Sequence, residues 1–198
     1  MNAAFHIGVL SLQGDFAAHG RMLERIGCRS VEVRKPEQLR DMAGLIIPGG
    51  ESTTLLKLME AWHFERAIRE FHAAGKPIFG TCAGVILLAT EVTHPSQHCL
   101  GLLDVTVERN SYGRQIDSFE SHGMYTVNGQ ETQRPLEMVF IRAPRITRVG
   151  PGVRVLARHA AEPVLVAAHN VWGATFHPEM TSDTTVHQSF ASLCASAR

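Results

Sequence analysis

The chain has no excess charge of either sign. Lys and Arg together number 19, and Asp and Glu together also number 19, over 198 residues. Proteins that bind nucleic acid or an anionic membrane surface through electrostatics usually carry a surplus of positive charge. The balance therefore argues against both kinds of partner.

Long apolar runs and closely spaced cysteines are also missing. No run approaches the ~18 residues that a membrane-spanning helix needs. The first residues show no basic region followed by an apolar one, so we expect no secretory signal. The four cysteines form neither a CxxC pair nor a dense framework. Sparse cysteines are typical of a reducing compartment, and we expect a cytoplasmic protein with free thiols.

Phosphate-binding loops are absent as well. Neither GxxxxGK[ST] nor GxGxxG occurs where a predicted strand leads into a helix, which argues against a nucleotide site of these kinds. His94, His98 and Cys99 have a spacing that a metal ion could use, but they lie in a predicted loop without a carboxylate. We therefore expect no metal site.

The length and composition indicate one globular domain. A chain of 198 residues can bury a sizeable core but is short for two domains. The hydrophobic fraction of 44% is ordinary for a globular protein, and no linker, internal repeat or low-complexity segment is visible. We expect a single domain over residues 1–198.

Strands and helices alternate in the first half of the chain. Apolar runs predict strands at residues 7–12, 31–33, 44–47 and 77–79, and helical patterns follow the first strand (with Asp15 as a possible cap) and cover 55–61, 64–74 and the segment from 85. Alternation of this kind implies a parallel sheet covered on both faces.

The second half changes character. From residue 103 onward, short alternating runs separated by turn residues indicate antiparallel strands, and a last helix is expected at 184–195. The expected fold class is thus α/β: a single-domain, flavodoxin-like three-layer sandwich with a mostly parallel central sheet and antiparallel additions in the second half.

A cysteine lies in a glycine-flanked turn between a predicted strand and a predicted helix. Cys82 stands at the centre of Gly80-Thr81-Cys82-Ala83-Gly84. Glycine neighbours let the backbone make a tight turn without Cβ clashes. The thiol would project at a helix N-terminus, where free N–H groups favour a thiolate and can receive an oxyanion. The sequence therefore predicts a nucleophile, with a buried structural cysteine as the alternative.

A cysteine nucleophile needs a base and a group that orients the base. His177 and Glu179 follow the last predicted strand, and Pro178 between them rigidifies the turn. A carboxylate two residues after a histidine can reach its ring and set the tautomer. The alternative is a histidine that merely ends a strand, and only the tertiary structure can bring His177 to Cys82.

Glycines and arginines elsewhere could form a receptor for a substrate. Gly49 and Gly50 follow a buried strand, so their N–H groups could face an oxyanion or a carboxylate; the alternative is an ordinary turn with Ser52 as a helix cap. Arg109 and Arg142 lie beside apolar strands and could hold a carboxylate, or could simply be solvated. Ligands bind at the carboxyl ends of parallel strands, which predicts that these turns and Gln13 lie close to Cys82.

These motifs resemble a known family. Gly80–Gly84 (GTCAG) and Phe176–Glu179 (FHPE) are similar to the class I, triad-type glutamine amidotransferases. Within them, LQG at 12–14, PGGESTT at 48–54, ERNSYGRQ at 108–115 and FIRAP at 140–144 resemble the glutaminase subunits of pyridoxal 5'-phosphate synthase. The resemblance covers nearly the whole chain. Two features depart from it: Met180 replaces the usual leucine, and 122–134 follows no recognisable pattern.

The resemblance implies a complete set of roles. Cys82 attacks the side-chain amide of L-glutamine, His177 carries protons and Glu179 orients His177. Oxyanion donors are implied at Gly49, Gly50 and Ala83. The implied glutamine site consists of Gly50, Glu51, Ser52, Arg109, Ile141 and Arg142. The ammonia passes to a synthase (lyase) subunit in a large hetero-oligomer that makes pyridoxal 5'-phosphate, and this chain needs no cofactor.

Two other functions remain open at this point. A non-catalytic flavodoxin-like binding module would use the glycine turns to bind a metabolite or a partner. A cysteine-dependent hydrolase or deglycase of the DJ-1 type would share the cysteine turn, but it would not need the paired glycines together with the downstream His-Pro-Glu.

Overall fold

The computed structural model describes residues 5–109, 118–126 and 133–197. The first half of the chain contains β1 (His6–Leu10), α1 (Phe16–Arg25), β2 (Arg29–Val33), the 3-10 helix η1 (Pro36–Asp41), β3 (Gly44–Ile47), α2 (Ser52–Ala61), α3 (Phe64–Ala73), β4 (Ile78–Thr81) and α4 (Ala83–Leu88). The second half contains β5 (Ala89–Thr93), β6 (Leu103–Glu108), β7 (Phe119–Thr126), β8 (Gln133–Phe140), β9 (Arg145–Val149), β10 (Arg154–His159), β11 (Glu162–Ala168), β12 (Val171–Ala174), the 3-10 helix η2 (Pro178–Met180) and α5 (Thr185–Ser196).

A nine-stranded sheet forms the centre of the molecule. Its strand order is β2-β1-β3-β4-β12-β11-β10-β7-β8. The strands β2, β1, β3, β4 and β12 pair with one another in parallel, and β11, β10, β7 and β8 extend the sheet through antiparallel pairs that begin at β12. A second sheet has the order β5-β6-β9. The expected α/β class, with a parallel centre and antiparallel additions, is confirmed.

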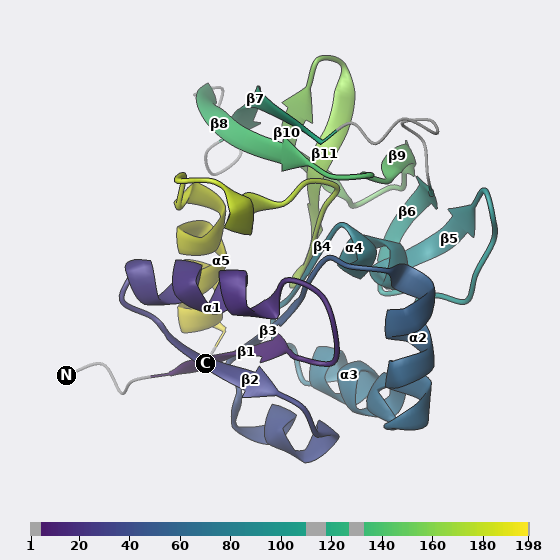
Figure 1. Ribbon diagram of the computed structural model, residues 1–198, viewed down its shortest axis with the longest axis vertical. Coiled ribbons are helices and arrows are strands. Elements are labelled where there is room, and N and C mark those ends of the chain that lie inside the picture. Colours follow the sequence, from purple (N-terminus) through teal and green to yellow (C-terminus); the bar gives the residue numbers. More distant parts are fainter. Residues whose placement is uncertain (1–4, 110–117, 127–132, 198) are drawn as a thin grey trace.

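Helices cover both faces of the parallel strands. Figure 1 shows α1 and α5 together on one side of the sheet, and α2, α3 and α4 on the other. Side chains that alternate along the strands fill the two resulting cores, because successive residues of a strand point to opposite faces. Ile46 and Phe79 pack in the core below α1 and α5, whereas Ile47 and Ile78 pack in the core that contains α2, α3 and α4.

The structure differs from the expectations about individual elements in three places. The final strand, β12, pairs antiparallel with β11 but parallel with β4, so it belongs to the parallel centre. The strands β5 and β9 were not expected. The helix expected from residue 85 ends at Leu88, and β5 follows it directly. Asp15 does occupy the N-cap position of α1, but its side chain makes no capping hydrogen bond within the described residues. Strand pairing over long sequence separations decides these features, and local patterns do not contain it.

The structure also bears on membrane insertion and on the thiols. Within the described residues, none of the helices has the length and apolar character required to cross a bilayer. All four cysteines lie in described segments and are unpaired.

Close packing of α4 on the sheet generates a prediction about glycine. A Cβ on Gly84 would overlap the carbonyl oxygen of Ile47, so Gly84→Ala should force α4 away from β3 and lower the free energy of unfolding by about 1–3 kcal/mol. Gly20 lies in α1, where a Cβ would meet only Ser30 Oγ at 3.5 Å, so Gly20→Ala should raise stability by about 0.5–1 kcal/mol. Urea unfolding of both variants checks this pair, and equal effects would contradict it.

Candidate active site

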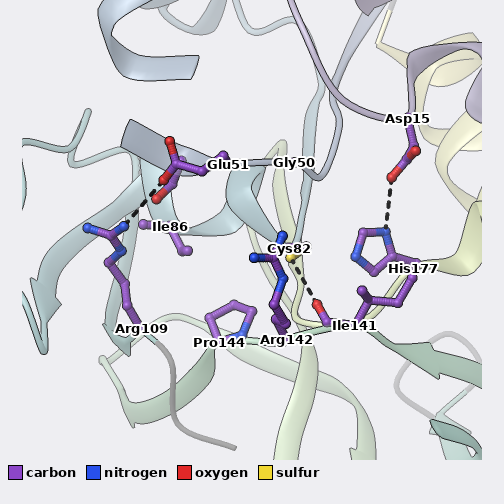
Figure 2. Close-up of a pocket in the computed structure, with 11 residues that line it drawn as sticks. Asp15, Gly50, Glu51, Cys82, Ile86, Arg109, Ile141, Arg142, Pro144 and His177 are labelled. Carbon is purple, nitrogen blue, oxygen red and sulfur yellow. Dashed lines mark hydrogen bonds and ion pairs between the residues drawn. The ribbon is translucent and has the colours of Figure 1, made fainter. Parts of the chain in front are cut away.

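A pocket opens where the parallel strands β1, β3 and β4 end. Its volume is about 170 Å³. Figure 2 shows the side chains that line it, which come from both halves of the chain: Asp15, Gly50, Glu51, Ser52, Cys82, Ile86, Arg109, Ile141, Arg142, Pro144 and His177. The prediction that the turns after the strands meet at one edge of the sheet is confirmed.

Cys82 occupies a strained turn between β4 and α4. Its backbone has φ 48° and ψ −102°, a conformation that a residue with a side chain rarely adopts. A Cβ on the neighbouring Gly80 would lie 2.5 Å from the backbone of Gly84, so the turn depends on this glycine. The Cys82 N–H donates to Ala174 O at 2.9 Å, and Cys82 Sγ lies 4.0 Å from Ile141 O. The thiol thus stands at the start of α4 and borders the pocket.

His177 and Glu179 leave the end of β12 as a hydrogen-bonded pair. His177 Nδ1 lies 2.7 Å from Glu179 Oε1, and both residues are buried. Because an ionised carboxylate only accepts, Nδ1 carries the proton. Gly49 packs against this pair: a Cβ there would overlap the His177 ring and lie 3.2 Å from Cys82 Cβ. The expected contact between Glu179 and His177 is present, and the fold brings both to Cys82.

The contacts among Cys82, His177 and Glu179 favour the charged forms of His177 and Glu179. Burial lowers the pKa of His177, but hydrogen bonds to Cys82 and Glu179 outweigh it and raise that pKa to about 10. Burial also raises the pKa of Glu179, yet the nearby His19 and the hydrogen bond from His177 bring it below its usual range. The arrangement therefore favours an imidazolium between a carboxylate and the cysteine.

The two glycines of the turn after β3 differ in their hydrogen bonding within the described residues. The Gly49 N–H donates to Thr81 Oγ1 at 3.1 Å, so it is engaged away from the pocket, and the idea that Gly49 donates to an oxyanion is corrected. Gly50 has φ 146° and borders the pocket. A Cβ on Gly50 would lie 2.5 Å from Gln13 Nε2, which confirms that Gln13 reaches this turn. Gly50 N–H and Ala83 N–H, at the start of α4, remain candidate donors.

Glu51, rather than Ser52, caps α2. Its carboxylate accepts from the Thr53 N–H at 3.0 Å and the Thr54 N–H at 2.6 Å. Partial burial raises the pKa of Glu51, but these hydrogen bonds outweigh it and lower the pKa to about 2. Ser52 is buried and donates to Gln97 Oε1 at 3.1 Å. Both residues border the pocket, as expected.

The two arginines of the pocket have different partners. Arg109 Nη2 donates to Thr53 Oγ1 at 3.1 Å and lies 3.6 Å from Glu51 Oε1. No hydrogen bond or ion pair engages the Arg142 guanidinium within residues 5–109, 118–126 and 133–197, and Arg142 has the strained φ of 44°. Figure 2 shows Arg142 in front of Cys82, beside Ile141. Residues 110–115 of the 108–115 motif lie outside the described residues, as do residues 127–132 of the unassigned stretch at 122–134.

Sequence reasoning missed three residues of the pocket. Asp15, Ile86 and Pro144 border it, and Asp15 Oδ2 lies 3.9 Å from His177 Nδ1. The position of Asp15 in the turn after β1 could have predicted its place in the pocket, because the carboxyl ends of parallel strands lie at the same edge of the sheet. Asp15, His177 and Glu179 also offer metal-ligating atoms within 4.8 Å of one another, although His177 Nδ1 and Glu179 Oε1 already bind each other. In the 94–99 loop, His98 Nε2 contacts Glu65 Oε2 at 3.1 Å.

The sequence matches the SNO glutamine amidotransferase family over residues 9–196. The chain belongs to this family. It is 54% identical over 187 residues to the pyridoxal 5'-phosphate synthase subunit PdxT of Koribacter versatilis, covering 94% of each chain. It is 49% identical over 187 residues to the PdxT subunit of Bacillus velezensis, covering 94% of this chain and 93% of that one.

Solved structures agree with this assignment. A crystal structure of a glutamine amidotransferase superposes with a TM-score of 0.87 at 45% sequence identity, covering 95% of this chain and 98% of that one. PurLQS from Thermotoga maritima has a TM-score of 0.74 at 18% identity, covering 96% of this chain and 99% of that one. At that low identity the second likeness concerns the fold alone.

Two further buried histidines lie behind Glu179. His19 and His187 are fully buried, and His19 Nδ1 lies 2.9 Å from His187 Nε2. Burial lowers the pKa of His187 to about 3, and burial is also the main reason that the pKa of His19 is lowered. Both imidazoles are therefore neutral in the folded protein at neutral pH.

The neutral His187 generates a prediction about acid stability. In the unfolded chain His187 becomes protonated below its ordinary pKa of 6.5, whereas in the folded chain it stays neutral down to about pH 3. The free energy of unfolding therefore decreases as the pH is lowered from about 6.5 to about 3. Between about pH 7 and pH 5 this one group should cost about 2 kcal/mol. The variant His187→Gln should lose that much less over the same interval, as measured by urea unfolding. Equal losses in both proteins would contradict the assignment of a neutral His187.

Proposed function

We propose that this protein hydrolyses L-glutamine to L-glutamate and ammonia, as the glutaminase subunit of a pyridoxal 5'-phosphate synthase. One observation carries the proposal: Cys82, His177 and Glu179 meet at a pocket in a chain of the SNO glutamine amidotransferase family. Relatives named as PdxT subunits of that synthase match this chain over almost its whole length, which supports the more specific role. Because all four thiols are free, we place the protein in the reducing cytoplasm.

In the proposed reaction, Cys82 Sγ attacks the side-chain amide carbon of glutamine. The Gly50 and Ala83 N–H groups stabilise the oxyanion of the tetrahedral intermediate. His177 donates a proton to the nitrogen as the C–N bond breaks, so that ammonia leaves and a γ-glutamyl thioester remains on Cys82. His177 then takes a proton from water, which attacks the thioester and releases glutamate. Glu179 keeps the His177 ring oriented through both steps.

We assign recognition of the glutamine backbone to the side of the pocket that carries Arg142. An arginine whose guanidinium has no partner in the described chain can pair with the substrate α-carboxylate through two hydrogen bonds. Arg109 is already engaged with Thr53 and Glu51, so it would position the start of α2 and add charge. Gly50, Glu51, Ser52 and Ile141 complete the proposed glutamine site.

The proposed partner is the synthase subunit that consumes the ammonia. Relatives are named as subunits of a synthase, which supports a hetero-oligomer in which ammonia passes from this chain to the other. A non-catalytic binding module has no use for a buried His–Glu pair that contacts a strained cysteine. A DJ-1-type hydrolase is disfavoured by the family match over residues 9–196.

The nucleophile can be tested by covalent labelling. A diazo-ketone analogue of glutamine, added to the complex with the synthase subunit, should alkylate Cys82 and spare the other thiols. Burial raises the pKa values of Cys28, Cys99 and Cys194, which keeps those thiols protonated and unreactive. Peptide mass mapping locates the label. Labelling mainly on one of the other three cysteines would exclude Cys82 as the nucleophile.

The carboxylate receptor can be tested by kinetics. The variant Arg142→Ala should raise KM for glutamine by about 10- to 100-fold, the value of a lost charge-assisted hydrogen bond, with little change in kcat. Ground state and transition state both carry the α-carboxylate, so the contact contributes equally to each. Arg148→Ala, which removes an exposed arginine paired with Asp104, is the matched control and should leave both constants unchanged. A fall in kcat at unchanged KM for Arg142→Ala would instead indicate a structural role.

A further inference from the structure

A buried polar cluster lies on the side of Glu179 that faces away from the pocket. His19 comes from α1, His187 from α5 and Thr81 from β4, and none of them is exposed to solvent. His19 Nε2 lies 3.3 Å from Glu179 Oε2 and 3.2 Å from Thr81 Oγ1. The other nitrogen of the same ring, Nδ1, lies 2.9 Å from His187 Nε2. One imidazole therefore touches three polar side chains from three different elements.

The charge of Glu179 selects the tautomers of both rings. Glu179 Oε2 and His187 Nδ1 are buried atoms with no hydrogen-bond partner in the described chain. If His187 Nε2 carries its proton and donates to His19 Nδ1, then His19 carries its own proton on Nε2. That N–H bonds Thr81 Oγ1 and directs its positive end toward the neighbouring carboxylate oxygen. The reverse assignment would set a ring lone pair against Glu179 Oε2 and bury an unpartnered N–H on His187, and both are costly.

Thr81 extends the cluster to the glycine turn. Its Oγ1 receives the N–H of Gly49 at 3.1 Å in addition to the N–H of His19. The peptide that follows Gly49 contributes the Gly50 N–H, which is the proposed oxyanion donor. The orientation of His19 therefore affects His177 through Glu179, and it affects the Gly49–Gly50 turn through Thr81.

We propose that His19, held in one tautomer by His187, is a positioning residue for the glutaminase reaction that fixes the Glu179 carboxylate against His177. The inference rests on the proposed function. His19 takes no part in bond making or proton transfer, because its ring lies behind Glu179 and is not among the residues that border the pocket. It stabilises the negative charge of Glu179 from the far side, and that charge in turn stabilises the imidazolium of His177.

The charges around His19 are consistent with this role. The titratable groups that face it are Glu179, His187, His177 and Asp15, of which the carboxylates favour a proton on the ring and the histidines oppose a second one. Burial dominates and lowers the pKa of His19, so the ring acts as a neutral donor. A neutral N–H donor keeps Glu179 ionised without adding a second full charge that would repel the imidazolium.

The test replaces His19 in the complex with the synthase subunit. His19→Leu removes the N–H that faces the Glu179 carboxylate, and kcat for glutamate release should fall by about 10- to 100-fold. KM should stay unchanged, because His19 does not touch the substrate. His19→Gln places an amide N–H near the position of Nε2 and should restore most of the rate. His187→Gln keeps a donor to His19 and should retain activity, whereas His187→Leu should reduce kcat.

A second readout separates positioning from mere stability. The rate of Cys82 alkylation by iodoacetamide, followed by peptide mass mapping, reports formation of the thiolate–imidazolium pair. In His19→Leu the midpoint of the pH profile of alkylation should move to higher pH. A Glu179 carboxylate that is no longer held against His177 stabilises the imidazolium less, so the Cys82 thiol gives up its proton only at higher pH. Val186→Ala removes fully buried methyl groups beside His187, and should lower the thermal midpoint without changing kcat or the alkylation profile.

The outcomes are distinct. If His19→Leu is less stable but keeps its kcat and its alkylation profile, or if His19→Gln fails to restore either one, the positioning role is wrong. If His19→Leu does not fold, the comparison of His187→Gln with His187→Leu decides the same question. Absence of glutaminase activity in the unmodified complex would instead overturn the proposed function. A shifted alkylation profile would still support the link from His19 to His177, because that measurement needs no turnover.

Discussion

The burial of the Glu179 carboxylate is the constraint on which the site depends. A buried charge is very unfavourable unless polar groups surround it. Here His177 supplies a hydrogen bond on the pocket side, and His19 supplies an N–H edge on the other. These partners come from α1 near the start of the chain and from the segment after β12 near its end. The hydrogen-bonding requirement of one buried carboxylate therefore brings together α1 and the segment after β12, which lie near opposite ends of the sequence.

Close backbone approach is the second physical condition. The turn at Cys82 needs small neighbours because α4 packs directly on β3, where a side chain on Gly84 would overlap the Ile47 carbonyl. A side chain on Gly49 would enter the His177 ring, and one on Gly14 would overlap the carbonyl oxygen of Gly49. Because these positions carry no side chain, Cys82, His177 and the Gly49–Gly50 turn can lie close together.

The antiparallel half completes a pocket that the parallel half begins. The loop after β8 carries Ile141 and Arg142 over Cys82, and β6 ends at the segment that contributes Arg109. Helices α1 and α5 lie on the opposite face from α2, α3 and α4, so the pocket at the strand ends is supported from both layers (Figure 1). The parallel centre thus carries Cys82 and His177, and the later strands and loops contribute Arg109, Ile141 and Arg142 to the pocket.

The sequence alone determined the local chemistry of this protein. The glycine-flanked Cys82, the His-Pro-Glu segment and the alternation of strands with helices all follow from neighbours a few residues apart, where turn sterics and side-chain periodicity act. Sequence patterns could not show that β12 lies beside β4, that Glu51 caps α2, or that the Gly49 N–H is taken by Thr81. Nothing distinguished His19 and His187 among 11 histidines. Their meeting, 168 residues apart along the chain, is decided only when α1 and α5 pack on the same face of the sheet, because hydrogen bonds depend on distance in space and not on distance in sequence.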